Sequence, residues 1–218
     1  MARVASWPHV FHEGAPHGPV LLTLHGTGAD ENDLVPLGKT LLPDAPVISP
    51  RGTVSEQGMN RWFVRRSEGV FDVDDVIARA GELAQFVTEA LAHYGLQGRP
   101  VVATGFSNGA NMATATTLLH PDVVSIAVSF SGMYPFGDRD PLGDVGGVRL
   151  FLANGEADPM APLTSVDRLE TVASKHGANV SRVTRPGGHG ITPDELARAK
   201  EWLVSVTGSS EQSGKNQP

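Results

Sequence analysis

Short apolar runs alternate with longer segments of helical periodicity along most of this chain. The runs are rich in Val, Leu and Ala and are bounded by Gly, Pro or Asp, which is typical of strands. Because several of them are apolar at nearly every position, they predict a parallel sheet that is covered on both faces. We expect strands at residues 20–24, 46–49, 101–106, 123–130, 148–153 and 179–184.

The segments between these runs carry apolar residues every three or four positions, which is the period of one buried helical face. Asp72 can cap the longest segment and Gly95 can end it. Thr192 and Glu195 form a capping box around Pro193 at the start of the last segment. The alternation of strands and helices predicts an α/β fold with a mostly parallel central sheet and helices on both faces. We expect helices at residues 73–94 and 108–119, a third with its apolar stripe at residues 163–173 that ends by Gly177, and a last one that starts at Pro193 with its apolar stripe at residues 196–206.

Length and charge restrict the class of protein. The 218 residues suit one domain, which we expect to span residues 1–208. Residues 209–218 contain no aliphatic or aromatic side chain, so we expect a disordered tail without chemistry. The 17 Lys and Arg against 24 Asp and Glu give a net charge of −7, which disfavours nucleic acid and anionic membranes as partners.

Three features that the sequence lacks restrict its chemistry and its location. The chain has no Cys, which excludes disulfides, thiolate metal sites and a cysteine nucleophile. No apolar run approaches the ~18 residues of a membrane-spanning helix. Residues 1–18 also lack the apolar stretch of a signal peptide. We therefore expect a cytoplasmic protein with no membrane insertion.

A candidate nucleophile follows the predicted strand at residues 101–106. Residues 105–109 read Gly-Phe-Ser-Asn-Gly, a G-x-S-x-G motif between a strand and a helix. A serine exposed on such a tight turn needs small residues two positions before and after it, and Gly105 and Gly109 supply them. The motif alone could be a glycine-rich turn with a structural serine. Its place between a β-rich run and a helix favours Ser107 as a nucleophile.

The predicted strand at residues 20–24 is followed by a glycine-rich turn that can present a backbone amide at the same edge of the sheet. Acyl transfer needs two donors directed at the developing oxyanion, and the amides of Thr27 and Asn108 are the candidates. A phosphate-binding loop or an ordinary turn is the alternative. Dinucleotide binding is disfavoured, because Glu31 stands where the third glycine of that motif would be.

The two remaining groups of a nucleophilic triad also follow predicted strands. Asp158 and Glu156 come after residues 148–153, and we favour Asp158; His189 lies in a glycine-flanked loop after residues 179–184. A carboxylate would hold the imidazole in the required tautomer, and the imidazole would take the serine proton. Taken singly, Asp158 could be a turn residue and His189 an exposed loop residue. The chain order of serine, aspartate and histidine is nevertheless that of the α/β-hydrolases.

Together these segments resemble the phospholipase/carboxylesterase family, the acyl-protein-thioesterase-like branch of the α/β-hydrolases. Within it the chain is most similar to the small bacterial MhqD-like serine hydrolases. The family implies an α/β-hydrolase fold without a large lid domain, and hydrolysis of acyl esters or thioesters without a cofactor or metal. The stretches that carry the resemblance are LLTLHGTGADENDL at 21–34, SPRG at 49–52, NRWFVRR at 60–66, GVFDVDDV at 69–76, GFSNGANMA at 105–113, FLANGEADPMAPL at 151–163 and GGHGIT at 187–192.

By position, the resemblance implies that Ser107 is the nucleophile, Asp158 the acid and His189 the base. It assigns the oxyanion hole to the backbone amides of Thr27 and Asn108. The expected enzyme is a carboxylesterase or thioesterase that forms an acyl-enzyme on the serine. The expected substrates are small soluble esters or thioesters with short acyl chains, and the expected assembly is a monomer or a homodimer.

The resemblance also suggests that Trp62 and Phe63 line the substrate pocket. From the residues alone, these aromatic side chains could equally be core or dimer contacts. Met133 and Met160 follow strand ends and are further candidates for the pocket lining.

Other interpretations of the same scaffold are open. One is a non-catalytic α/β-hydrolase-fold binding protein, which the complete set of triad residues disfavours. Another is an acyltransferase that uses the same triad while water is excluded. Dienelactone hydrolases usually have Cys as nucleophile and dehalogenases have Asp, whereas this chain has Ser107 at that position.

Overall fold

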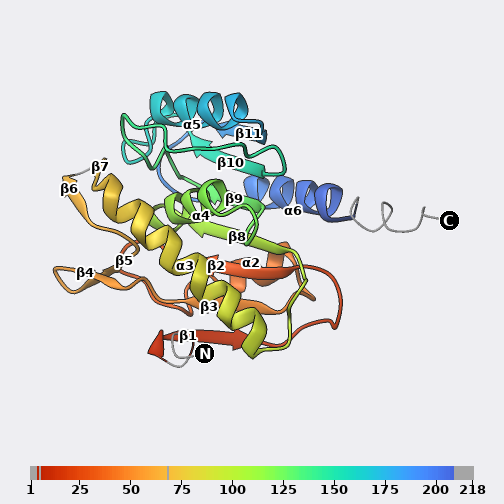
Figure 1. Ribbon diagram of the computed structural model, residues 1–218. Coiled ribbons are helices and arrows are strands. Elements are labelled where there is room, and N and C mark those ends of the chain that lie inside the picture. The colour runs from red at the N-terminus through yellow and green to blue at the C-terminus, as the bar shows by residue number, and fades with distance from the viewer. Residues whose placement is uncertain (1–3, 5, 68, 209–218) are drawn as a thin grey trace.

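The computed structural model describes residues 4, 6–67 and 69–208. At its centre lies a seven-stranded sheet with the spatial order β1 (His9–His12), β3 (Val47–Pro50), β2 (Val20–Leu24), β8 (Val101–Phe106), β9 (Ile126–Phe130), β10 (Arg149–Gly155) and β11 (Asn179–Arg185) (Figure 1). The edge strand β1 runs antiparallel to β3, and the other neighbouring strands are parallel. The mostly parallel central sheet of an α/β fold is therefore confirmed.

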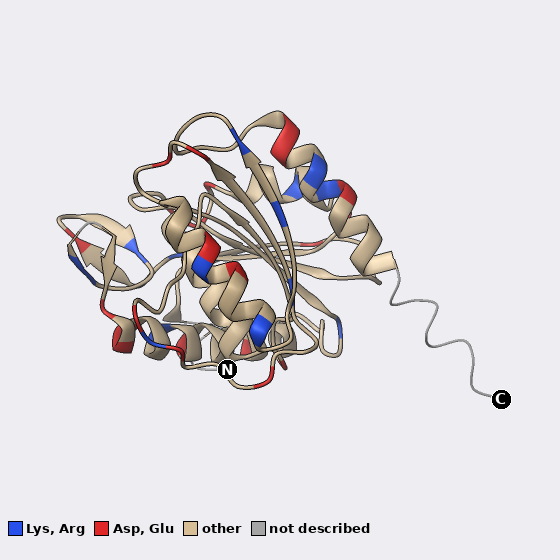
Figure 2. Cartoon of the chain, turned by 90° about the horizontal axis from the view of Figure 1, so that it is seen from above, with Lys and Arg blue, Asp and Glu red and all other residues tan. Residues whose placement is uncertain are grey.

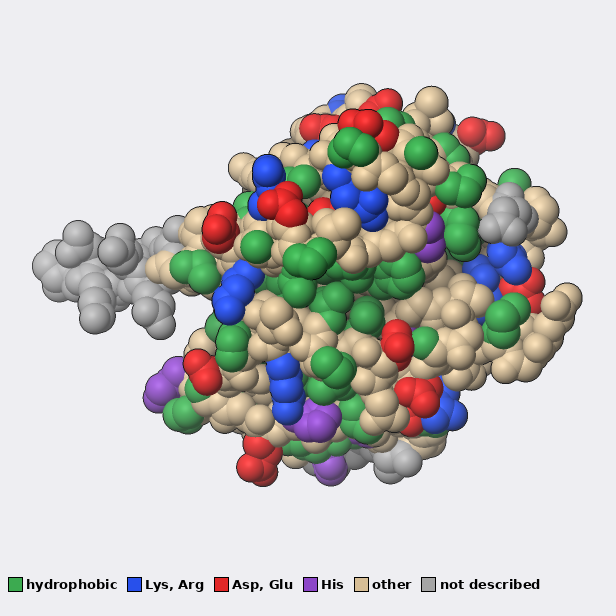
Figure 3. Space-filling view, turned by 180° about the vertical axis from the view of Figure 1, so that it is seen from behind, with side chains coloured by type: hydrophobic (Ala, Val, Ile, Leu, Met, Phe, Trp, Pro, Cys, Tyr) green, Lys and Arg blue, Asp and Glu red, His purple; other side chains and the backbone are tan. Residues whose placement is uncertain are grey.

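Helices cover both faces of the sheet, as the alternating pattern predicts. The helices are α2 (Val35–Leu41), α3 (Val73–His93), α4 (Asn108–Leu119), α5 (Leu163–Lys175) and α6 (Pro193–Gly208). Successive residues of β2 explain the two layers, because side chains alternate between the faces of a strand. Leu22 packs in the core with α3, α4 and α5, whereas Leu21 packs in the core with α2 and α6. On the face of α2 and α6, hydrophobic side chains form a band across the molecule (Figure 3).

The ends of the helices follow the predicted capping chemistry. Asp72 precedes α3, and its carboxylate accepts a hydrogen bond from the backbone N–H of Asp75 at 3.3 Å. Gly95 follows the end of that helix with φ of +68°, a conformation that glycine adopts without strain. Thr192 and Glu195 bond to each other's backbone N–H groups at the start of α6, at 3.3 and 2.8 Å. The capping box is therefore present.

Several elements differ from the sequence-based expectation. The strand expected at residues 123–130 is shorter, since β9 begins at Ile126. The strand β1, the helix α2 and two small sheets have no clear signal, because they are short and partly polar. The small sheets pair β4 (Val54–Glu56) with β5 (Met59–Arg61), and β6 (Arg65–Ser67) with β7 (Val70–Phe71).

Further sequence-based expectations concern the distribution of charge, membrane-spanning helices and the C-terminal tail. Acidic and basic residues are interspersed over the helices and loops (Figure 2). None of the described helices combines the length and the apolar character that spanning a bilayer requires. The tail expected at residues 209–218 lies outside the described residues.

Candidate active site

Ser107 occupies a strained turn between β8 and α4. Its backbone has φ of +55° and ψ of −117°, in the left-handed half of conformational space that non-glycine residues rarely adopt. The turn is held because the N–H of Ser107 donates to the carbonyl of Phe130 at 2.9 Å, while the carbonyl of Ser107 accepts from the N–H of Asn111 at 3.1 Å. Strain of this kind persists only where surrounding contacts enforce it, and it is common at functional sites.

The two glycines of the motif allow this turn to form. A Cβ atom on Gly105 would overlap the carbonyl oxygen of Gly109. A Cβ atom on Gly109 would overlap the carbonyl oxygens of Leu24 and His25, at the end of β2. The strand, the helix and the neighbouring strand can therefore approach one another only when both positions lack a side chain.

Asp158 and His189 form the acid–base pair of the site. Asp158 follows β10, and its side chain is fully buried. One carboxylate oxygen lies 2.8 Å from Nδ1 of His189, and the other accepts from the backbone N–H groups of Met160 at 2.9 Å and Ala161 at 3.2 Å. Glu156, the alternative acid, is exposed. With Nδ1 donating to the carboxylate, Nε2 of His189 carries the lone pair that a general base needs.

The imidazole lies beside the serine turn. The ring of Phe106, the residue before Ser107, is 4.9 Å from the ring of His189 between centroids. The end of β9 contacts both segments, because Phe130 accepts from Ser107 and Ser131 bonds to Gly190. In the part of the chain that the structure describes, no hydrogen bond joins Ser107 to His189. In enzymes without substrate such catalytic contacts are often long.

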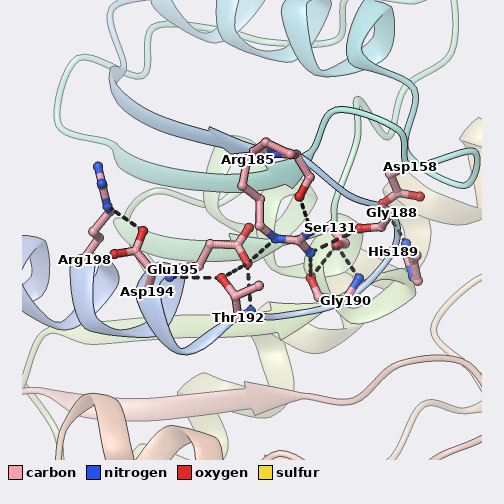
Figure 4. A network of polar contacts seen from close by, with 11 residues as sticks. Ser131, Asp158, Arg185, Gly188, His189, Gly190, Thr192, Asp194, Glu195 and Arg198 are labelled. Carbon is pink, nitrogen blue, oxygen red and sulfur yellow. Dashed lines mark hydrogen bonds and ion pairs between the residues drawn. The ribbon is translucent and has the colours of Figure 1, made fainter.

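A polar network fixes the loop that carries His189 (Figure 4). The guanidinium of Arg185 donates to the carbonyls on either side of the histidine, at 3.1 Å to Gly188 and 2.9 Å to Gly190. Its Nε donates at 2.7 Å to Glu195, whose side chain is 1% exposed. Ser131, itself at φ of +51°, donates to the carbonyl of Gly190 at 3.0 Å and accepts from its N–H at 3.2 Å.

The predicted oxyanion donors belong to residues that line one cleft with Ser107. Asn108 is the first residue of α4, so its N–H has no partner within the helix. The side-chain oxygen of Asn108 accepts from the N–H of Trp62 at 2.8 Å. The hydroxyl of Thr27 accepts from Arg61 at 3.0 Å. The consecutive residues Arg61 and Trp62 therefore contact both sides of the candidate oxyanion hole.

His25 supports the loop that contains Thr27. Its Nδ1 bonds to the carbonyl of Gly26 at 2.7 Å, and its Nε2 accepts from the N–H of Gly52 at 2.9 Å, which requires a neutral ring. Burial lowers the pKa of His25 below 6.5, outweighing the opposing effect of nearby carboxylates. The indole of Trp62 donates to the carbonyl of His25 at 2.9 Å. His25 is thus a positioning residue beneath the oxyanion loop.

The cleft beside Ser107 is shallow, with a volume of about 30 Å³. Met160 lines it, whereas Met133 lines a neighbouring cavity of about 380 Å³. Trp62 and Phe63 are 2% and 0% exposed and lie in the hydrophobic core, and neither lines these two cavities. Their burial agrees with the alternative that both are core residues. It does not support the suggested role in lining the substrate pocket. The residues lining the cleft are Thr27, Arg61, Arg65, Gly69, Phe71, Ser107, Asn108, Asn111, Ser131 and Met160.

Sequence reasoning did not identify the residues that hold the catalytic loops. Arg185 and Ser131 carry no motif, and their contacts join segments far apart in the chain. Glu195 is visible in the sequence only as part of a capping box. His25 is visible only as the residue before the glycine-rich turn. Arg61 and Arg65 do have a sequence signal, because both belong to the stretch NRWFVRR at residues 60–66, which is one of those that carry the family resemblance.

Comparisons with known proteins show the family and the fold of the chain. The sequence profile described as Phospholipase/Carboxylesterase matches residues 6–207. MhqD of Bacillus subtilis (strain 168) is 38% identical over 194 residues, which cover 89% of this chain and 96% of MhqD. The fold is similar to that of the Bacillus cereus carboxylesterase, with a TM-score of 0.88, 37% identity, and coverage of 93% and 95% of the two chains. A carboxylesterase from Mesorhizobium loti gives a TM-score of 0.83 at 32% identity, covering 91% and 95%.

Proposed function

The chain belongs to the phospholipase/carboxylesterase family of α/β-hydrolases, and we propose that it cleaves carboxylic esters of small substrates with Ser107, His189 and Asp158 as its triad. The observation that carries this proposal is the geometry at the carboxyl edge of the sheet. A serine on a strained turn lines a cleft, and a histidine with a buried carboxylate partner lies beside that turn.

The first step is attack by Ser107 on the ester carbonyl. Nε2 of His189 takes the hydroxyl proton as the oxygen bonds to carbon. Asp158 stabilises the imidazolium that forms, and its other oxygen is held by two backbone N–H groups, so it does not rotate away. His189 then gives the proton to the leaving alcohol, and an acyl-enzyme remains on Ser107.

The second step repeats this chemistry with water. His189 takes a proton from the water that attacks the acyl-enzyme, and the acid is released as Ser107 regains its proton. In both steps negative charge develops on the former carbonyl oxygen. The amides of Thr27 and Asn108 are the proposed donors to that oxygen, and each such donor typically lowers a barrier by ~3–4 kcal/mol.

Two features of the site support short, soluble substrates. The cleft of about 30 Å³ is far smaller than the ~300 Å³ at the lower end of ligand sites. Most side chains that line it are polar, so it does not offer a long apolar channel for an acyl chain. Thioesters place a carbonyl in the same position and form the second substrate class of the proposal. The cytoplasmic location and the assembly as monomer or homodimer stay predictions from the sequence.

Replacing the nucleophile tests the proposal. We expect Ser107→Ala to lower kcat for 4-nitrophenyl esters about 10⁴-fold or more, because the acyl-enzyme can no longer form. A fluorophosphonate probe should label the native protein and leave Ser107→Ala unlabelled. Ser174→Ala, which changes an exposed residue of α5, is the matched control and should retain both properties. Full turnover by folded Ser107→Ala would overturn the assignment.

The same experiment separates the alternatives. A binding protein without activity would neither turn over esters nor react with the fluorophosphonate. An acyltransferase would react with the probe, but in the presence of an added alcohol it would give a new ester in place of the free acid. Matched ester and thioester substrates of graded chain length would then define the preferred acyl and leaving groups.

A further inference from the structure

Asn111 presents a polar side chain to the cleft beside Ser107. It lies one turn after Ser107 on α4, and side chains on a helix lean toward its N-terminus, so the carboxamide of Asn111 covers the turn that carries the serine. Asn111 is 6% exposed and lines the cleft together with Ser107 and Asn108. A carboxamide that is nearly buried needs partners for its oxygen and for its NH2 group.

The oxygen of this carboxamide has a partner within the protein. Oδ1 of Asn111 accepts a hydrogen bond from the backbone N–H of Met133, which follows β9, at 2.7 Å. An N–H group needs an acceptor, so this bond determines which end of the carboxamide faces Met133. The NH2 group, with its two donors, therefore points away from Met133.

The NH2 group has no partner within the protein. In the part of the chain that the structure describes, Nδ2 of Asn111 makes no hydrogen bond. Nδ2 of the neighbouring Asn108 also lacks a partner, but protein atoms enclose it completely, whereas Nδ2 of Asn111 is accessible. Because Asn111 lines the cleft, its free donors open onto it. Such donors beside a nucleophile can bind a hydrogen-bond acceptor of the substrate.

Three of the four substituents at the reacting carbon already have a place in the proposed mechanism. One is the oxygen of Ser107, and the developing oxyanion faces the proposed amide donors of Thr27 and Asn108. The leaving-group oxygen must lie beside His189, which gives it a proton. The fourth substituent is the acyl chain, which takes the remaining side of the cleft.

Asn111 lies on that remaining side. The ring of His189 contacts Phe106, which packs with the hydrophobic core on the face of α2 and α6. The helix α4, which carries Asn111, covers the opposite face together with α3 and α5. Met133, the partner of Asn111, lines the neighbouring cavity of about 380 Å³, and Phe71 lines both that cavity and the cleft. An acyl chain that extends from the nucleophile toward this cavity therefore passes the NH2 group.

We propose that the NH2 group of Asn111 donates a hydrogen bond to an oxygen atom in the acyl chain, so that the favoured substrates are esters of short acids that carry an ether, hydroxyl or carbonyl oxygen near the ester group. This inference rests on the proposed esterase function and specifies the acyl group of its substrates. Asn111 acts here as a specificity-determining residue, and no bond to it forms or breaks.

The test compares uncharged esters of equal shape. The 4-nitrophenyl esters of methoxyacetate and 3-methoxypropionate are paired with those of butyrate and valerate, in which a CH2 group replaces the ether oxygen. Each kcat/KM is divided by the rate constant for hydrolysis of the same ester by hydroxide, which corrects for the inductive effect of the oxygen. We expect the native protein to favour the ether member of at least one pair about tenfold, because the alkyl member leaves the NH2 group without a partner.

Two variants of Asn111 separate its donor from its acceptor. Asn111→Asp retains an oxygen for the N–H of Met133 but replaces the NH2 group by a second oxygen, so the ratio of ether to alkyl kcat/KM should fall to about one or below. Asn111→Ala removes both contacts and should also bring the ratio to about one. Asn179→Asp makes the same chemical change at an exposed position at the start of β11 and is the matched control, which should keep the native ratio.

The outcomes are distinguishable. A corrected ratio near one for both pairs in the native protein would overturn the inference while the esterase proposal stands. A native ratio in Asn111→Asp would also overturn it, because Asn111 would then serve only to hold the segment of Met133. So would an equal fall of the ratio in Asn179→Asp. If the native protein hydrolysed none of the four esters, the proposed function itself would fail, and this inference with it.

Discussion

Replacing Arg185 by Met tests whether the hydrogen bonds of its guanidinium position the loop that carries His189. Met has similar length without charge or donors, so the substitution removes the ion pair to Glu195 and the hydrogen bonds to the carbonyls of Gly188 and Gly190. The carboxylate of Glu195 would remain buried, with hydrogen bonds from the N–H and hydroxyl of Thr192.

The expected loss of stability depends on how deeply the ion pair between Arg185 and Glu195 is buried. Removing one partner of a buried ion pair typically costs about 3–5 kcal/mol. The side chain of Glu195 is 1% exposed, but that of Arg185 is 17% exposed, so water can replace part of the guanidinium. We therefore expect a loss of about 3 kcal/mol in the free energy of unfolding. For a chain of this length, that corresponds to a decrease in Tm of about 6–12 °C.

A double variant separates stability from catalysis. In Arg185→Met/Glu195→Gln the buried charge is gone, and the amide can still accept from the N–H of Thr192, so we expect more than half of the lost stability to return. The carbonyls on either side of His189 stay without their guanidinium. A small displacement of the base can cost about 100-fold in rate, so we expect kcat/KM to stay 10- to 100-fold below the native value in both variants.

Urea unfolding and ester hydrolysis at a temperature where all proteins are folded give the two readouts. Native kcat/KM in the double variant would refute the reasoning, because it would show that the bonds from Arg185 do not position the histidine. A single variant within 1 kcal/mol of native stability would refute the burial argument.

Two further predictions concern the oxyanion loop and the serine turn. Stability should decrease as the pH falls below about 6.5, because the folded pKa of His25 is lowered and the unfolded chain then binds more protons; His25→Asn should remove this part of the slope, measured by urea unfolding between pH 5 and 7. Gly109→Ala should abolish activity and lower Tm, measured by calorimetry, since its Cβ would overlap the carbonyl of Leu24; Gly143→Ala, at a position with open space, should retain native Tm.

The parts of the fold predicted from sequence are those with a local signal. The strand β2 is buried at all five positions and apolar at all but Thr23, and the helix α4 begins and ends where the pattern places it. The edge strand β1 and the helix α2 lack such a signal, because their positions are only partly buried or their length is two turns. Whether these segments form a strand or a helix depends on the neighbours that they pack against, and the local sequence pattern does not contain that information.

The candidate triad could be predicted for a geometric reason. In a parallel sheet the carboxyl ends of all strands meet at one edge, so residues that directly follow strands are brought together whatever their distance in sequence. The positions of Trp62 and Phe63 follow no such rule. They lie in a segment without periodicity, and their burial depends on contacts such as that of Trp62 with Asn108, which is 46 residues away.

Those long-range contacts also couple the two halves of the proposed oxyanion hole. Thr27 and Asn108 follow different strands, yet consecutive residues hold both: Arg61 bonds to the hydroxyl of Thr27, and the N–H of Trp62 bonds to the side chain of Asn108. Glu56 pairs with both Arg61 and Arg65, so this set of contacts continues from the oxyanion loop into β6. The two proposed oxyanion donors are thus linked through a few adjacent residues, which is why the segment from Glu56 to Arg65 contributes more to the site than its lack of a catalytic motif indicates.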